Sequence, residues 1–308
     1  MSHPAVHVSD QVTHAVESGA PVVALESTIF THGLPRPRNL AVALEAEELV
    51  RAAGAVPATI GVYRGVPTVG LTTEQITVLS NADGIDKVSL RDLPVVASLG
   101  RDGGTTVAAT AYLAHLAGVR VFATGGLGGV HRGASESFDE SADMTTLAVT
   151  PITVISAGVK SILDIGATLE RFETLNLPVI GYGTRRYPGF YVSDSGYRLQ
   201  YSVDSPEEAA KVVSTRDALG LQQAVLLANP VDESLQLPPS VLDDVLRRAW
   251  EEAGRQGIGG NAATPFLLDF IQRETGGRSL EVNVAVYRGN VTLGAEVAVA
   301  LSAERNQE

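Results

Sequence analysis

The chain has 308 residues, of which 44% are hydrophobic and 19% are charged, so it is long and apolar enough to bury a sizeable globular core. Its formal net charge of −12 and the absence of a basic run argue against RNA or DNA as a partner, because affinity for nucleic acid depends on Lys and Arg against phosphate. The absence of cysteine excludes disulfides, thiolate zinc sites and a cysteine nucleophile.

Short apolar runs alternate with amphipathic segments along the chain, which is the pattern of an α/β protein. In chain order, strands are predicted at Pro21–Leu25, Ala58–Tyr63, Val119–Ala123, Ile152–Ile155, Pro178–Tyr182 and Ala224–Ala228. Helices are predicted at Asn39–Ala53, Thr72–Asn81, Thr106–Ala117, Ser161–Leu175, Pro206–Leu219, Pro239–Gln256 and Pro265–Glu274. Because nearly continuous apolar strands are separated by helices, we expect a mainly parallel sheet covered on both faces.

Charged residues at the ends of two apolar segments are the first candidates for a site. Glu26 ends the run VVALEST, and a carboxylate there is costly unless it is paired or functional. It fits either a general acid or a structural glutamate paired with an arginine of THGLPRPRN. Lys87, in GIDKVSLRDL, lies near Asp86, Arg91 and Asp92, and fits either an ion pair or an anion ligand.

Two glycine-rich turns follow further along the chain. The segment Gly103-Gly104-Thr105-Thr106-Val107 offers N–H groups and hydroxyls at a predicted helix start, which suits phosphate. Thr105 or Thr106 would serve equally well as an ordinary helix cap. The segment ATGGLGGVH lacks the G-x-G-x-x-G spacing of a dinucleotide site, which is evidence against NAD.

Three carboxylates lie close together in ESFDESADM, namely Asp139, Glu140 and Asp143. Such a group suits a hard cation such as Mg²⁺ or Mn²⁺, which prefers oxygen ligands. The alternative is a solvated acidic helix start that Ser141 or Asp139 caps.

Lysine is rare in this chain, since only three of its 23 basic residues are lysine. Lys211 lies four residues after Glu207 on a predicted helix, and we interpret this spacing as a structural ion pair. Lys160 lies in PITVISAGVKSILDIGATL, after a buried strand and at the predicted start of a helix. Burial there would favour the neutral amine that a Schiff-base nucleophile needs. The alternative is a lysine whose ammonium group reaches water.

The remaining sequence gives no sign of export or of a second domain. The first ten residues have neither a basic nor a strongly apolar region, and no apolar stretch approaches the roughly 18 residues of a membrane span. We therefore expect a cytoplasmic protein that does not associate with membranes. No linker, repeat or low-complexity segment marks a boundary, so one domain over residues 1–308 is expected.

Taken together, these segments resemble the pseudouridine-5′-phosphate glycosidase family over roughly residues 10–301. The motifs that carry the resemblance are, in order, ALESTIFTHGLPRPRN, KVSLRDLP, DGGTTVAAT, FATGGLGGVHRG, SADM, SAGVKSILDIGATLE, GYGTRRYPGFY, ANPVDE, TPFLLDFI and NVAVYRGNVTLGAEVAVAL. The resemblance implies a three-layer α/β/α fold and a homotrimer. It also implies a lyase that reversibly converts pseudouridine 5′-phosphate and water to uracil and ribose 5-phosphate.

The resemblance further implies roles for individual residues. Lys160 corresponds to the lysine that forms a Schiff base with ring-opened ribose, and Glu26 corresponds to the proton donor. The positions that match substrate contacts are Lys87, Thr106, Val107, Ser141, Ala142, Asp143 and Asn283. Asp139 matches the single protein ligand of Mn²⁺, which Mg²⁺ could replace.

Two segments depart from the family pattern, and two other functions share the same residues. Asn261 stands where the family often has lysine, and TRRYPGFY replaces a more acidic segment. A Schiff-base aldolase acting on another phosphosugar would use Lys160 and the same phosphate turn without recognising uracil. A catalytically silent phosphosugar-binding protein would bind without a metal and without turnover.

Overall fold

Eleven strands form the sheet in the computed structural model, which describes residues 5–258 and 263–305. They are β1 (His7–Val8), β2 (Val22–Leu25), β3 (Val56–Tyr63), β4 (Val66–Val69), β5 (Asp86–Val88), β6 (Gly103–Thr105), β7 (Val121–Ala123), β8 (Thr153–Ser156), β9 (Val179–Tyr182), β10 (Tyr201–Val203) and β11 (Val225–Ala228). The order is β1-β4-β3-β2-β7-β8-β11-β9-β10, with β6 beside β3 and β5 beside β6. Only β4 and β6 pair antiparallel, both with β3, which confirms the mainly parallel sheet in these ranges.

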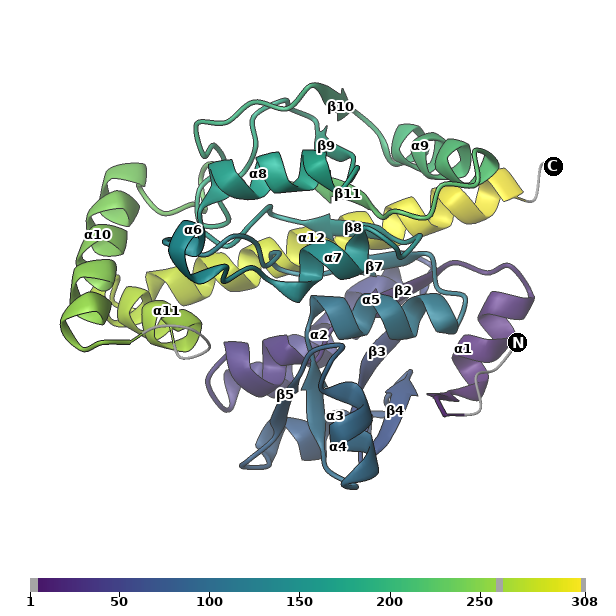
Figure 1. Cartoon of the computed structure of the whole chain (residues 1–308). Coiled ribbons are helices and arrows are strands. Elements are labelled where there is room, and N and C mark those ends of the chain that lie inside the picture. Colours follow the sequence, from purple (N-terminus) through teal and green to yellow (C-terminus); the bar gives the residue numbers. More distant parts are fainter. Residues whose placement is uncertain (1–4, 259–262, 306–308) are drawn as a thin grey trace.

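Helices cover both faces of this sheet, so the fold is the expected three-layer α/β/α arrangement (Figure 1). The helical segments are α1 (Asp10–Glu17), the π-helix η1 (Ile29–Gly33), α2 (Arg38–Ala52), α3 (Thr73–Asn81), α4 (Leu93–Ser98), α5 (Val107–Leu116), α6 (Ala134–Ser137), α7 (Ala142–Leu147), α8 (Ile165–Thr174), α9 (Pro206–Ala218), α10 (Pro239–Arg255), α11 (Ala263–Glu274) and α12 (Arg278–Arg305). None of the helices within the described ranges is long and apolar enough to span a membrane.

Successive residues of the central strands belong to two different hydrophobic cores. In β2, Val22 and Ala24 pack into one core, and Val23 and Leu25 pack into the other, because successive strand side chains point to opposite faces. The first core includes buried residues of α1, α5, α7 and α8. The second includes those of α2, α3, α9 and α12, and Figure 1 shows α12 running the length of the molecule along this face. Burial on both faces explains why the strands are almost entirely apolar.

The predicted elements agree closely with the observed ones, with one correction that concerns the site. Each predicted strand lies within two residues of an observed strand at both ends. The predicted helix Ser161–Leu175 begins four residues too early, because Asp164 caps α8 by accepting a hydrogen bond from the Ala167 N–H at 2.9 Å. Lys160 therefore lies in the turn before α8, and its predicted place at a helix start is wrong.

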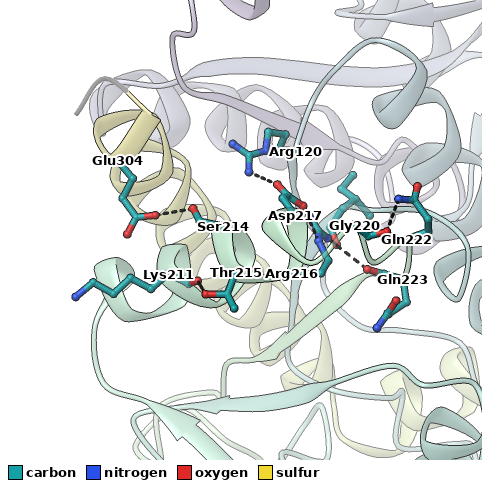
Figure 2. Close-up of polar contacts among 11 residues, drawn as sticks. Arg120, Lys211, Ser214, Thr215, Arg216, Asp217, Gly220, Gln222, Gln223 and Glu304 are labelled. Atoms are coloured by element: carbon teal, nitrogen blue, oxygen red, sulfur yellow. Dashed lines mark hydrogen bonds and ion pairs between the residues drawn. The ribbon is translucent and has the colours of Figure 1, made fainter. Parts of the chain in front are cut away.

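A buried arginine joins several elements at the amino ends of the parallel strands (Figure 2). Arg216 of α9 is 4% exposed, and its guanidinium donates to the carbonyls of Ile152 and Gln223, which precede β8 and β11. Its Nε also donates to Oδ1 of Asp217 at 2.7 Å. Asp217 pairs in turn with Arg120, which precedes β7. This cluster fixes the edge of the sheet opposite the carboxyl ends of the strands.

We expect Asp217→Asn to lower the free energy of unfolding by about 2–3 kcal/mol, because it leaves the buried Arg216 charge without a counter-charge. This value is reduced from that of a fully buried pair because the Asp217 side chain is 35% exposed. Thermal unfolding should show a Tm lower by about 5 °C. Asp243→Asn removes the same charge from an exposed position of α10 and serves as the control. Equal Tm values for the two variants would contradict the prediction.

Candidate active site

A cavity of about 480 Å³ lies where β2, β7 and β8 end. In parallel α/β sheets, ligands bind at this edge. The predicted site residues that line the cavity are Glu26, Lys87, Thr106, Val107, Asp139, Ser141, Ala142, Asp143 and Lys160. Asn283 of α12 lines an adjoining cavity of about 200 Å³ that shares Glu26, Lys87 and Lys160 with the first. The fold thus brings all the predicted site residues together, apart from the segment with Asn261, which lies outside the described residues.

Glu26 follows β2 directly and is 7% exposed. The hydroxyl of Thr28 donates to one of its carboxylate oxygens and the hydroxyl of Thr124 donates to the other. The alternative of a salt bridge to an arginine of the following segment is wrong. Arg36 pairs with Asp83, and Arg38 pairs with Glu281. Glu26 is therefore a carboxyl group held by neutral hydrogen-bond donors at the wall of a cavity, an arrangement suited to proton transfer.

Lys160 lies in the turn after β8, and backbone hydrogen bonds hold it there. Its N–H donates to the carbonyl of Leu127 at 3.1 Å, and its carbonyl accepts from the N–H of Leu163 at 2.9 Å. The neighbouring residue Ser161 is buried, and its hydroxyl donates to the carbonyl of Gly189. The backbone on each side of Lys160 is thus fixed while the side chain lines both cavities. Only the side chain of Lys160 is therefore free to adjust to a ligand in the cavities.

Lys87 reaches the cavity from β5, which the sequence did not predict as a strand. The ion pair considered for Lys87 is not the one observed. Arginines pair with the neighbouring carboxylates instead, Arg101 with Asp86 and Arg91 with Asp92. The side chain of Lys87 is accessible from the cavity, yet the surrounding walls exclude enough water to lower the pKa of Lys87. The positive charge of Lys160 lowers it further, while Asp143 and Glu26 oppose the shift.

The helix α5 begins at the cavity, and the residue just before it has a hydroxyl group without a hydrogen-bond partner among the described residues. Thr106 occupies the N-cap position, but its side chain caps nothing, and its buried Oγ1 has no partner among the described residues. The ordinary capping role considered for Thr106 is therefore wrong. Thr105 is also not a cap, since its hydroxyl donates to the carbonyl of Ile60 at 2.8 Å. Thr106 and the N–H of Val107 together offer donors to an anion at the positive end of a helix dipole.

Asp143 also contacts the beginning of α5. Its Oδ1 accepts from the Ala108 N–H at 3.0 Å, and its Oδ2 accepts from the Gly128 N–H at 2.9 Å. Asp143 is 7% exposed and joins α7, α5 and the turn after β7. The hydroxyl of Ser141 caps α7 by accepting from the Asp143 N–H, as one of the two sequence-based alternatives expected. Both carboxylate oxygens of Asp143 are therefore occupied by backbone N–H groups.

The three carboxylates do not gather into one cation site. Glu140 pairs with Arg171 at 2.9 Å, and no group of three or more His, Cys, Asp or Glu side chains suited to a metal occurs in the described ranges. Asp139 remains at the cavity wall, with its Oδ2 3.8 Å from Nδ1 of His131. One carboxylate beside an open cavity fits a largely hydrated divalent ion rather than a closed protein cage.

The glycines of the turn after β7 are required by close packing. A Cβ on Gly126 would lie 2.5 Å from Cδ2 of Phe190, and a Cβ on Gly128 would lie 2.7 Å from Oδ2 of Asp143. A Cβ on Gly129 would lie 2.4 Å from Oγ1 of Thr168. These glycines therefore allow the turn to pack closely against Phe190, Asp143 and Thr168, and dinucleotide binding is not needed to explain them.

Comparison with known proteins shows to which family the chain belongs. The family model described as indigoidine synthase A like protein matches residues 11–300. The chain belongs to this family. A relative from Saccharopolyspora erythraea named pseudouridine-5′-phosphate glycosidase is 63% identical over 295 residues, which cover 96% of this chain and 97% of the relative. A relative of the same name from Deinococcus radiodurans is 48% identical, with 96% and 95% of the two chains covered.

Two solved structures have the same fold as this chain. The prealnumycin C-glycosynthase AlnA, solved in complex with ribulose 5-phosphate, has a TM-score of 0.93 and 34% identity, with 99% of this chain and 100% of that chain covered. An indigoidine synthase A-like protein from Thermotoga maritima has a TM-score of 0.88 and 34% identity, covering 98% and 99% of the two chains. These comparisons confirm the family resemblance and the fold.

Several residues of the site were missed in the sequence. Thr28 and Thr124 hold Glu26, and His131 lies beside Asp139. Thr28 is two residues from Glu26, and its hydroxyl type was the only available signal. Thr124 is separated from Glu26 by 98 residues, and only the parallel pairing of β2 with β7 makes them neighbours.

Proposed function

We propose that this family member reversibly cleaves the carbon–carbon glycosidic bond of pseudouridine 5′-phosphate, giving uracil and ribose 5-phosphate. The observation that carries the proposal is the meeting of Lys160, Glu26 and the open end of α5 in one cavity. They provide a nucleophile, a proton donor and an anion site. The relative that is 63% identical and named for this activity supports the choice of substrate.

In the proposed reaction the neutral amine of Lys160 attacks C1′ of the ribose, and the bond from C1′ to the ring oxygen breaks. The ring oxygen takes up the proton that the Lys160 nitrogen releases after the attack and becomes a hydroxyl. Glu26 then donates a proton to the uracil carbon bonded to C1′. That bond breaks as the nitrogen lone pair of Lys160 forms the C1′=N bond of an iminium. Water adds to the iminium and releases ribose 5-phosphate with the neutral amine of Lys160, and the proton set free in this step returns to Glu26, so that one water is consumed overall.

The phosphate would bind at the beginning of α5. There the Thr106 hydroxyl and the Val107 N–H offer donors, and Lys87 supplies a positive charge from β5. Asp143 holds this helix end against the turn after β7 through the N–H groups of Ala108 and Gly128. The sugar would then extend from α5 toward Lys160, with the base near Glu26. Ser141 and Ala142, which line the same wall, are proposed as further substrate contacts.

A divalent ion, Mn²⁺ or Mg²⁺, is proposed at Asp139. When bound, it would supply positive charge to the sugar phosphate in the cavity. Asp139 would be its single carboxylate ligand, with His131 beside it and water in the remaining positions.

Chelation of divalent ions should therefore reduce turnover, and added Mn²⁺ should restore it. Asp139→Asn removes the charged ligand and should raise the Mn²⁺ concentration needed for half-maximal activity by about tenfold or more. Glu140→Gln changes the adjacent carboxylate, which pairs with Arg171, and serves as the control. A titration in which both variants match the unaltered protein would contradict the role of Asp139.

The lowered pKa of Lys87 predicts a pH dependence of substrate binding. Because only the protonated amine attracts phosphate, KM for pseudouridine 5′-phosphate should rise as the pH increases toward the ordinary lysine value of about 10.4. The rise should begin at lower pH than an ordinary lysine would cause. Lys87→Arg keeps its charge throughout this range and should flatten the profile, and Lys87→Met should give a high and constant KM. An unchanged slope in Lys87→Arg would contradict the prediction.

The test of the function is synthesis from its products. Purified protein with Mn²⁺, ribose 5-phosphate and uracil should form a C-nucleoside phosphate, detected by chromatography and mass spectrometry. A Schiff-base aldolase would trap ribose 5-phosphate on Lys160 under borohydride but form no C-nucleoside. A silent binding protein would do neither. The proposal fails if the C-nucleoside does not form in either the presence or the absence of metal.

Three further expectations remain predictions. They are assembly as a homotrimer, location in the cytoplasm, and a single domain over residues 1–308. Nucleic acid and membranes are not proposed as partners, and the proposed partners are the substrate and its two products.

A further inference from the structure

A buried asparagine in the middle of α12 forms hydrogen bonds with the turn after β7, beside the site. Asn290 is 1% exposed. Asparagine is less favourable than alanine inside a helix, and burial of an amide is costly unless hydrogen bonds satisfy it. Its Nδ2 donates to the carbonyl oxygens of Thr124 at 2.7 Å and Gly125 at 3.1 Å. Its Oδ1 accepts from Nδ2 of Asn229, which follows β11, at 3.0 Å. All the hydrogen-bonding groups of this amide are therefore used.

These bonds fix the turn that follows β7. The Thr124 N–H donates to the carbonyl of Ile155 at 3.0 Å, and the Ala157 N–H donates to the carbonyl of Gly125 at 3.0 Å. The turn is thus joined to the end of β8 by its backbone and to α12 by Asn290. Neither the Thr124 nor the Gly125 carbonyl can move without losing a bond to the Asn290 amide.

One side chain of this turn, that of Thr124, contacts Glu26. Thr124 is fully buried, and its hydroxyl donates to Oε1 of Glu26. The position of this hydroxyl follows from the position of its own backbone, which Asn290 holds. A chain of contacts thus runs from Asn229 and Asn290 through Thr124 to the carboxyl group of Glu26.

We propose that Asn290, supported by Asn229, is a positioning residue that holds Glu26 in line for proton transfer to the departing uracil carbon. The inference rests on the proposed function. Proton transfer requires the acid within hydrogen-bond reach of the accepting atom. A displacement of about 1 Å at the reacting group can cost roughly 100-fold in rate. Lys160 bonds to Leu127 and Leu163, and Leu127 is held separately because its N–H donates to the carbonyl of Gly158 at 2.9 Å, so we expect the Schiff base of Lys160 to form without Asn290.

The experiment separates these two steps. Asn290→Ala and Asn290→Asp both remove the donation to the two carbonyls, and Asn290→Asp keeps the size of the side chain. For each, kcat and KM for uracil release from pseudouridine 5′-phosphate are measured, together with borohydride trapping of ribose 5-phosphate on Lys160. We expect kcat to fall by about 10- to 100-fold. KM and the amount of trapped adduct should stay within about twofold of the unaltered protein.

Three further variants keep the proposal falsifiable if Asn290 proves necessary for folding. Thr124→Val removes only the hydroxyl and should reproduce the loss of kcat, and Thr124→Ser should restore most of it. Val291→Ala loosens the core at the next position of the same helix, where the side chain is fully buried and takes no part in the hydrogen bonds that link Asn229, Asn290, Thr124 and Glu26. It should lower Tm without a selective loss of kcat.

Three results would overturn the inference. They are an unchanged kcat in Asn290→Ala and Thr124→Val, an equal loss of trapped adduct and of kcat, or the same selective loss of kcat in Val291→Ala. A protein that carries no substitution and yet neither traps ribose 5-phosphate nor releases uracil would overturn the proposed function, and the inference with it. If the unaltered protein traps ribose 5-phosphate but releases no uracil, the proposed function and the inference are both overturned, and only the role of Lys160 as a nucleophile is kept.

Discussion

Lys160→Ala should remove both turnover and the borohydride-stable adduct, with kcat reduced by at least about 10³-fold. The amine is the only proposed covalent partner of the sugar, and neither Lys87 nor Lys211 can replace it. Lys87 lines the cavity from β5, where it is proposed to bind the phosphate, and Lys211 lies on α9, outside both cavities of the site. The adduct is mapped by mass spectrometry of the peptide that contains residue 160.

The rarity of lysine supplies a matched control for this variant. Lys211→Ala removes the same side chain from the surface and should leave turnover and trapping unchanged. An adduct that persists in Lys160→Ala and maps to Lys87 would exchange the roles of the two cavity lysines. Turnover that survives without any adduct would contradict the covalent mechanism.

Glu26→Gln should lower kcat by about 10²- to 10⁴-fold while leaving the Lys160 adduct with ribose 5-phosphate in place. Glutamine keeps the size of the side chain and an oxygen that can accept from Thr28 or Thr124, but it cannot donate a proton to carbon. The expected result is therefore a protein that binds and traps the sugar but releases uracil very slowly. Stopped assays for uracil and the trapping assay are run on the same preparation.

Glu47→Gln is the control for the loss of a buried glutamate. Glu47 is 4% exposed and lies on α2, where it accepts from Thr59 and pairs with Arg51, away from the cavity. It should affect Tm more than kcat. If Glu26→Gln loses trapping and turnover in parallel, Glu26 acts before the C–C cleavage step, and its role as proton donor to uracil is wrong.

The fold could be predicted from the sequence where each segment has one simple environment. The central strands are buried on both faces, so their runs of apolar residues are plain, and α9 and α10 begin at clear Ser and Pro signals. The short strands β5 and β6 carry glycine and charge instead of apolar residues. Their pairing beside β3 depends on contacts distant in sequence, which local patterns do not contain.

The helix α12 was missed for the opposite reason. It contacts α2, α9 and the sheet, so its buried residues are distributed around most of its circumference. A helix surrounded in this way has no single apolar stripe, and the period of 3.6 residues that reveals an amphipathic helix is weak.

The charged residues that line the cavity were easier to predict than the groups that hold them. Glu26 and Lys160 stand out because each is a charge beside an apolar strand, where burial demands an explanation. Thr124 and Asn290 are uncharged, and their partners lie 98 and 166 residues away. Their hydrogen bonds join segments that are distant in the sequence, and the spacing of residues within one segment does not reveal such contacts.

The position of α12 along the chain also constrains how the protein is made. Because residues 278–305 cover the part of one sheet face that α2, α3 and α9 leave open, that part stays exposed on the ribosome until synthesis has passed Arg305. At translation rates of about 5–20 residues per second, Glu26 emerges more than ten seconds before the helix that carries Asn290. During this interval the nascent chain presents an uncovered apolar surface, and it is then most in need of a chaperone.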